Sequence, residues 1–188
     1  MTALLDDALL GRLEAAWRER GALIADHLAP GLTDDEMRRL VEPLGIGLPL
    51  EARRWWGWHD GVTTTAARAH YIGPDFRILS LGEAVQLHET IRLSVDPDEL
   101  RWKPTWMPIV SWSRGDVAID CAAADETPVP VHRVDWEVGV EAAPSMREMV
   151  DAWLAVMANG GWRWERSENY WRVDTAKLPT DERLRLVT

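Results

Sequence analysis

The positions of hydrophobic residues along the chain predict several helices that each bury one face. Leu9, Leu13 and Trp17 recur at intervals of four, so residues 5–20 are predicted to form an amphipathic helix. The most complete helical pattern lies further along, where every inward position is apolar: Met146, Met149, Val150, Trp153, Leu154 and Met157. Such faces need an apolar surface to pack against.

Three Ser/Thr-x-x-Glu sequences predict where helices begin. Thr33, Ser80 and Ser145 each precede a glutamate by three positions, the arrangement of a capping box that bonds free amides of the first turn. Pro49 suits the first position of another helix, because its missing N–H needs no partner there. Gly61 is placed to end that helix in a left-handed conformation.

Residues 106–136 are predicted to form a three-stranded antiparallel ribbon. Short polar segments separate its β-rich runs, which are residues 106–112, 117–121 and 129–136. In the middle run Val117 and Ile119 share one face, whereas Ala118 and Asp120 share the other. The first face is apolar enough to need a cover, which the flanking helices can supply.

Two further segments favour β structure. Residues 76–79 are predicted to form a short strand, and residues 162–173 an edge hairpin whose turn lies near residues 167–169. The chain from residue 175 onwards is polar.

The composition is that of a globular domain with an acidic surface. The 188 residues are 28% charged and 46% hydrophobic, and they carry a formal net charge of -10. This charge argues against nucleic-acid binding, which depends on Lys and Arg neutralising phosphates. It favours a basic protein partner through complementary potentials, although acidity also serves solubility alone.

The sequence predicts neither a membrane segment nor export. No stretch approaches the ~20 apolar residues of a membrane span, and residues 1–7 are acidic where a signal peptide is basic. The single cysteine, Cys121, excludes an intramolecular disulfide and lies in an apolar run, where it is predicted to be a small buried residue. We therefore expect a cytoplasmic protein.

His59, Asp60 and Gly61 form the strongest candidate for catalytic chemistry. In an enzyme, His59 would act as a base that Asp60 orients. Adjacent residues near a helix end project in different directions, however, and no Ser or Cys lies in a nucleophile motif. A helix C-terminus, where His and Gly are both favoured, explains the triplet more simply.

Asp116 and Asp120 share one strand face, but about 13 Å of extended chain separates their Cα atoms. Catalytic pairs in glycosidases lie roughly 5–9.5 Å apart, so these two carboxylates make a poor dyad. The remaining histidines show no metal-binding spacing: His27, His70, His88 and His132. We expect no catalytic residue, no cofactor and no metal.

Several of these signals follow one another in a recognisable order. They are Leu48-Pro49 leading to His59-Asp60-Gly61, the strand from Phe76, Trp106-Met107-Pro108-Ile109, Gly115-Asp116 with Asp120, and Ser145 opening an amphipathic helix. Over roughly residues 31–164 this order resembles the SUKH superfamily, which includes fungal cell-wall assembly regulators and many bacterial immunity proteins.

The resemblance implies an α+β fold: a single domain with a mixed, mostly antiparallel sheet of about five or six strands, packed by N-terminal, middle and C-terminal helices. It divides the chain into an N-terminal helical extension (1–30), a SUKH-like domain (31–174) and a polar C-terminal tail (175–188). It also implies binding rather than catalysis, because bacterial members typically hold a cognate toxin, often a nuclease, inactive by direct contact.

The leading hypothesis is therefore a non-enzymatic protein-binding domain of the bacterial immunity type, with a basic nuclease-type toxin as partner. One alternative is an intracellular regulator or scaffold, and another is a small-molecule-binding or hydrolytic enzyme that uses His59. The contact surface is expected on the exposed sheet face, its rim and one helix end: Trp112, Ser113, Arg114, Asp116, Asp120, Trp58, His59 and Asp60. Trp and Arg favour binding hot spots and the acids suit a basic partner, but packing and turn geometry also explain several of them.

Overall fold

The computed structural model describes residues 3–65, 67–94, 102–113, 115–135, 139–185 and 187–188. The α-helices are α1 (Asp7–Arg20), α2 (Asp34–Val41), α3 (Leu50–Trp58), α4 (Leu81–Ser94), α5 (Met146–Ala158) and α6 (Glu182–Arg185). The strands are β1 (Tyr71–Gly73), β2 (Phe76–Ile78), β3 (Trp106–Trp112), β4 (Gly115–Asp120), β5 (Val131–Asp135), β6 (Gly139–Ala143), β7 (Trp162–Glu165) and β8 (Tyr170–Val173). Short 3-10 helices lie at Leu23–Asp26, Glu42–Leu44, Ala67–His70 and Thr175–Lys177.

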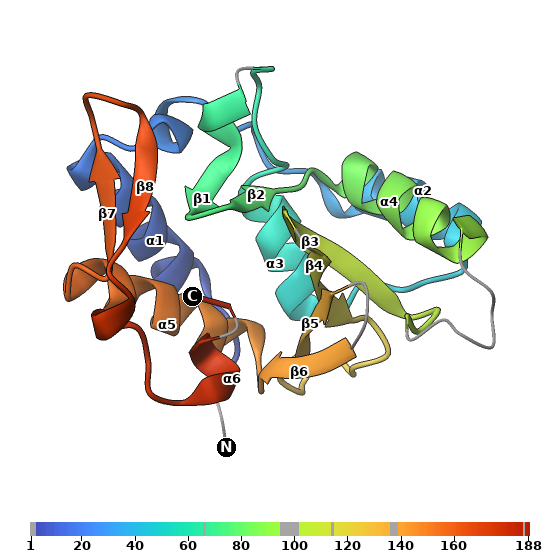
Figure 1. The fold of residues 1–188 in the computed structure, drawn as a ribbon. Coiled ribbons are helices and arrows are strands. Elements are labelled where there is room, and N and C mark those ends of the chain that lie inside the picture. Colours follow the sequence, from blue (N-terminus) through green and yellow to red (C-terminus); the bar gives the residue numbers. More distant parts are fainter. Residues whose placement is uncertain (1–2, 66, 95–101, 114, 136–138, 186) are drawn as a thin grey trace.

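The strands form a six-stranded antiparallel sheet in the order β1 to β6 and a separate two-stranded sheet, β7 and β8 (Figure 1). The predicted α+β domain is confirmed, and so is the ribbon of β3, β4 and β5 as far as Asp135, since Trp136 lies outside the described residues. The predicted hairpin at residues 162–173 forms, but as its own sheet, which stands beside β1 in Figure 1.

The predicted capping residues begin their helices. Thr33 and Glu36 form a complete capping box at α2, and Ser80 and Glu83 exchange the equivalent bonds at α4. At α5 the Ser145 side chain accepts a hydrogen bond from the Glu148 N–H. These interactions span four residues, so they depend on local geometry that a sequence pattern can show.

Helix α3 differs from the prediction at both ends. Pro49 is the residue before the helix rather than its first residue, and the helix ends at Trp58 with an extended His59. Gly61 is left-handed, with φ of +72°, but it lies beyond the helix end. A Cβ atom at Gly61 would lie 2.9 Å from the Ser80 nitrogen, so glycine allows this segment to pass closely over the start of α4.

Both faces of the large sheet are covered. Val117 and Ile119 belong to the main hydrophobic core, which α1, α3 and α5 also enter. On the opposite face Ala118 is buried with Trp102 and Trp106, and Ile91 of α4 packs against them. The exposed sheet face that the sequence predicted is therefore closed over its middle by a second, smaller core.

The two ends of the described chain are packed into the domain. Leu9, Leu13 and Trp17 of α1 are fully buried in the main core. At the other end, the Trp153 indole donates a hydrogen bond to the Val187 carbonyl over 2.5 Å, and Val187 is buried. Residues assigned from sequence to an extension and a tail thus contribute to the same core as the sheet.

Candidate functional site

The predicted partner surface does not form one continuous patch. Trp112 pairs with Gly115 across the β3–β4 turn, and Ser111 pairs with Asp116. Because side chains alternate along a strand, Trp112 lies on the face of the main core and Asp116 lies on the opposite face with Ala118. The Arg133 guanidinium covers the Trp112 ring at 3.6 Å. The prediction that these residues share a surface is wrong.

Asp116 is buried, with 6% of its surface exposed, whereas it was predicted to lie on the contact surface or in the turn before the strand. The reason is that β4 already begins at Gly115. Burial raises the pKa of Asp116 to about 6, against the opposing effects of the Ser111 hydrogen bond and the Arg77 charge. A carboxyl group in this position cannot be a contact at a surface.

Asp120 and Ser113 lie at opposite ends of strand β4 and its turn. Burial raises the pKa of Asp120, but hydrogen bonds from the Ala122 N–H and the Thr105 hydroxyl bring it below its ordinary value. These hydrogen bonds give Asp120 a local structural role at the end of β4. Ser113 is exposed, and Arg114 lies outside the described residues.

The end of α3 contacts α1 and the start of α4 through three side chains: Trp58, His59 and Asp60. Trp58 is half-buried and stacks on Trp17, with ring centroids 5.8 Å apart. His59 Nδ1 lies 2.7 Å from the Ala29 carbonyl and its Nε2 lies 3.4 Å from a Glu14 oxygen.

Asp60 accepts a hydrogen bond from the Leu81 N–H over 2.6 Å and so caps α4 from a distant segment. Burial, together with the negative charges of Glu83 and Glu36, raises its pKa against the effect of that hydrogen bond. The enzymatic interpretation required Asp60 to orient His59, but the structure gives the two side chains different partners.

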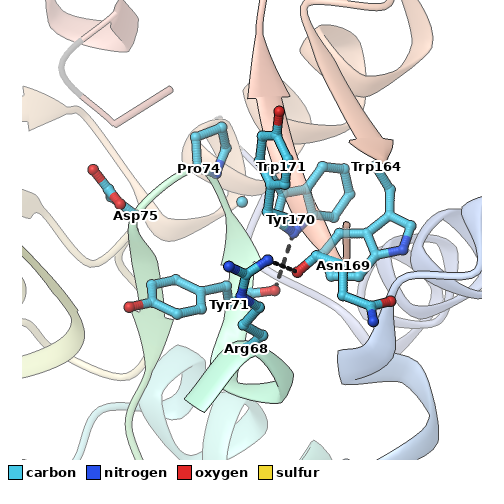
Figure 2. A pocket seen from close by; sticks show the side chains of 9 residues that line it. Arg68, Tyr71, Pro74, Asp75, Trp164, Asn169, Tyr170 and Trp171 are labelled. Atoms are coloured by element: carbon cyan, nitrogen blue, oxygen red, sulfur yellow. Dashed lines mark hydrogen bonds between the residues drawn. The ribbon is translucent and has the colours of Figure 1, made fainter. Parts of the chain in front are cut away.

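A pocket of about 430 Å³ lies between the β1–β2 turn and the β7–β8 hairpin. Figure 2 shows rings from both sides converging on it, with Trp164 across from Asp75. Its lining residues are Arg68, Tyr71, Gly73, Pro74, Asp75, Trp164, Asn169, Tyr170 and Trp171. None of these lining residues was predicted from the sequence to belong to a functional site.

Hydrogen bonds join the two walls of the pocket. The Trp171 indole donates to the Tyr71 carbonyl over 3.1 Å. Arg68 donates to the carbonyl of Glu168. It also donates, over 3.4 Å, to the carbonyl of Asn169 (Figure 2). The hairpin is therefore bonded to β1 and to the 3-10 helix that precedes it.

Each wall contains one non-glycine residue in the left-handed region. Asp75 has φ of +59° in the β1–β2 turn, and Asn169 has φ of +53° in the β7–β8 turn. Asp and Asn are the residues that adopt this conformation most easily after glycine. They are the only described non-glycine residues with positive φ, and both line this pocket.

Several polar groups around the pocket have no protein partner. Among the described residues, nothing bonds to the hydroxyls of Tyr71 and Tyr170 or to the Asn169 side-chain amide, and Arg68 forms no ion pair. The Trp171 indole is occupied by the Tyr71 carbonyl, and the buried Trp164 indole N–H has no partner. The lining thus combines flat aromatic surface with polar groups that remain able to bind a ligand.

Other features of the structure are weaker candidates for a functional site. A second hollow of about 610 Å³ lies against α2 and the start of α3, with Met37, Val41 and Leu48 among its lining. Within the described part of the chain, no group of three or more His, Cys, Asp or Glu could hold a metal ion, and no helix is long and apolar enough to cross a membrane. Cys121 is buried as predicted, and burial raises the pKa of its thiol to about 12.

In comparisons with known proteins, no protein-family model matches the chain and no curated protein is significantly similar to it.

The sequence contained one signal for the pocket. The hairpin with Trp164 and Trp171 was predicted, and tryptophan is abundant in the chain, with 12 residues. The opposite wall comes from Arg68 to Asp75, about 100 residues earlier, and nothing local predicts that these segments meet.

Proposed function

We propose that this protein is a non-enzymatic protein-binding domain and that the aromatic pocket receives a segment of its partner. The observation that carries the proposal is the convergence of Trp164, Tyr170 and Arg68 on one concave site. Trp, Tyr and Arg are the residue types that dominate binding energy at protein interfaces, and they do so when they form desolvated pockets.

The partner fits the immunity hypothesis if it is basic overall. The net charge of -10 would speed its encounter with a positively charged protein and disfavour acidic competitors. In this proposal the chain is a cytoplasmic member of the SUKH superfamily that holds a nuclease-type toxin inactive by direct contact. The order of motifs across residues 31–164 supports it, and the α+β fold agrees with it.

The test begins with tagged full-length protein used as bait in the native cell. Four baits are compared: wild type, Tyr170→Ala in the pocket, Ser113→Arg at the exposed β3–β4 turn, and Arg163→Ala. Arg163 lies on the same hairpin, is exposed and does not line the pocket, so it is the matched control. Each recovered protein is then purified and its Kd is measured by calorimetry.

We expect one basic protein whose Kd weakens about tenfold or more with Tyr170→Ala. Arg163→Ala should leave its Kd unchanged. If the recovered protein arrests growth when expressed alone, co-expression of the wild-type chain should restore growth. Equal affinity for wild type and Tyr170→Ala would overturn the pocket as the contact site. If only Ser113→Arg abolishes binding of the partner, the contact site lies at the β3–β4 turn instead.

A further inference from the structure

We infer that the partner segment in the pocket is an extended, proline-containing stretch in the polyproline II conformation. This inference rests on the proposed protein-binding function and specifies the chemistry of the bound segment. Two properties of the pocket carry it: the flat rings in its walls and the hydrogen-bond donors that have no protein partner.

The walls present several rings beside the Arg68 side chain, and the Arg172 guanidinium lies over one face of the Tyr170 ring, 5.1 Å from its centroid. Tyr71 and Pro74 lie on one side and Trp164 and Tyr170 on the other (Figure 2). The Trp164 and Trp171 rings meet edge to face, with centroids 5.4 Å apart, which limits their rotation. Proline-rich segments bind such aromatic grooves, because a pyrrolidine ring packs flat on an aromatic face and the segment is already extended before binding.

The polar groups of the pocket are mostly able to donate. Arg68 only donates, while Asn169, Tyr71 and Tyr170 can donate from groups that have no protein partner. Asp75 is the only lining side chain that only accepts. Asn169 and the two tyrosines can also accept. The Arg68 guanidinium can only donate, so the pocket suits a ligand that presents several acceptors.

A proline-containing segment has this composition. Proline lacks an N–H, and the carbonyls of a polyproline II segment make no internal hydrogen bonds. Each bound carbonyl can thus accept from Arg68, Asn169 or a tyrosine hydroxyl. A helical segment satisfies its own carbonyls and would leave the pocket donors unused.

The experiment titrates the full-length chain with blocked hexaproline and with a blocked Gly-Ser hexapeptide of equal length. Binding is followed by NMR through the indole N–H signals of Trp164 and Trp171. Four variants are compared with wild type: Tyr170→Phe removes a donor but keeps the ring, Tyr170→Ala removes both, Asn169→Gly removes a donor at a position with positive φ, and Arg163→Ala is the control.

Hexaproline should bind and the Gly-Ser peptide should not. Tyr170→Phe and Asn169→Gly should each weaken hexaproline binding by about 2- to 10-fold, and Tyr170→Ala should weaken it further. Arg163→Ala should leave it unchanged. Equal binding of both peptides, or binding that no pocket variant changes, would overturn the inference. So would stronger binding of maltose or of a blocked hexaglutamate peptide at the same indole signals.

The outcomes also separate the two proposals. If hexaproline fails to bind but the cellular partner still depends on Tyr170, the pocket is a protein-binding site with a different specificity and this inference is wrong. If hexaproline binds in the pocket but the partner is insensitive to Tyr170→Ala, the inference holds for the pocket and the proposed contact site of the partner is wrong.

Discussion

The indole nitrogen of Trp171 lies 3.1 Å from the carbonyl oxygen of Tyr71 and donates a hydrogen bond to it. This bond joins β8 to β1, the edge strand of the large sheet, across 100 positions of sequence. Trp171 is buried and Tyr71 is half-buried, so the bond is partly shielded from competing water. It fixes how far the hairpin stands from the sheet, and this distance sets the width of the aromatic pocket.

Replacing Trp171→Phe should therefore loosen the hairpin. The Tyr71 carbonyl loses its partner in a partly buried position, so we expect the free energy of unfolding to fall by about 1 kcal/mol. Urea denaturation measures the change. The matched control is Trp164→Phe, which removes an indole N–H that bonds to no described group. Equal losses for the two variants would show that ring packing, rather than the hydrogen bond, holds the hairpin.

Gly73 of β1 packs directly against the hairpin. A Cβ atom there would overlap the Trp162 ring, and the indole is fully buried and cannot move aside cheaply. Gly73→Ala should lower the free energy of unfolding by about 1–3 kcal/mol through overpacking and change the near-ultraviolet circular dichroism of the tryptophans.

Gly82→Ala is the control for this substitution. Gly82 lies in α4 with open space around its Cα, so alanine should stabilise the helix by about 0.5–1 kcal/mol. An unchanged stability in Gly73→Ala would contradict the close packing of β1 against the hairpin.

Asp116 should make stability fall as the pH rises. Its folded-state pKa, about 6, lies above the ordinary value of 3.8, so the folded state holds the proton more tightly. The resulting stabilisation is complete below about pH 4 and is lost as the pH rises through 6. Asp116→Asn should remove this loss, and its free energy of unfolding should gain about 2 kcal/mol on wild type between pH 4 and 7.

Urea denaturation at several pH values measures the difference between Asp116→Asn and wild type. Asp120→Asn is an informative control, because the pKa of Asp120 is lowered from 3.8 and its stabilisation is lost only as the pH falls below about 4. The difference between Asp120→Asn and wild type should therefore stay nearly constant across pH 4–7. A constant difference between Asp116→Asn and wild type across pH 4–7 would contradict the burial of this carboxyl group.

Glu51 should be among the most sensitive positions in the chain. Its fully buried carboxylate accepts hydrogen bonds from the Leu5 and Val129 N–H groups, which links the N-terminal segment to the loop before β5. Glu51→Ala leaves both buried donors unsatisfied, so we expect a loss of about 2–5 kcal/mol in thermal or urea denaturation. Glu36→Ala, at an exposed capping box, should cost less; the reverse order would show that the Leu5 and Val129 contacts are dispensable.

The sequence alone was sufficient for the features that depend on neighbouring residues. The starts of α2, α4 and α5 follow from Ser or Thr placed three positions before Glu, because that interaction is complete within four residues. The β3–β4–β5 meander follows from alternating runs joined by short turns. The burial of Cys121 follows from its apolar surroundings.

The tertiary structure decided what each polar or aromatic side chain does. Asp60 caps a helix that begins 21 positions later, and Trp112 and Asp116 were separated by a strand register that only the paired strands reveal. The pocket needs Tyr71 and Trp171 side by side, although 100 positions separate them. Local patterns encode helix starts and strand alternation because the atoms involved are covalently close. Which distant surfaces meet depends on the packing of the whole core, which no short stretch of sequence contains.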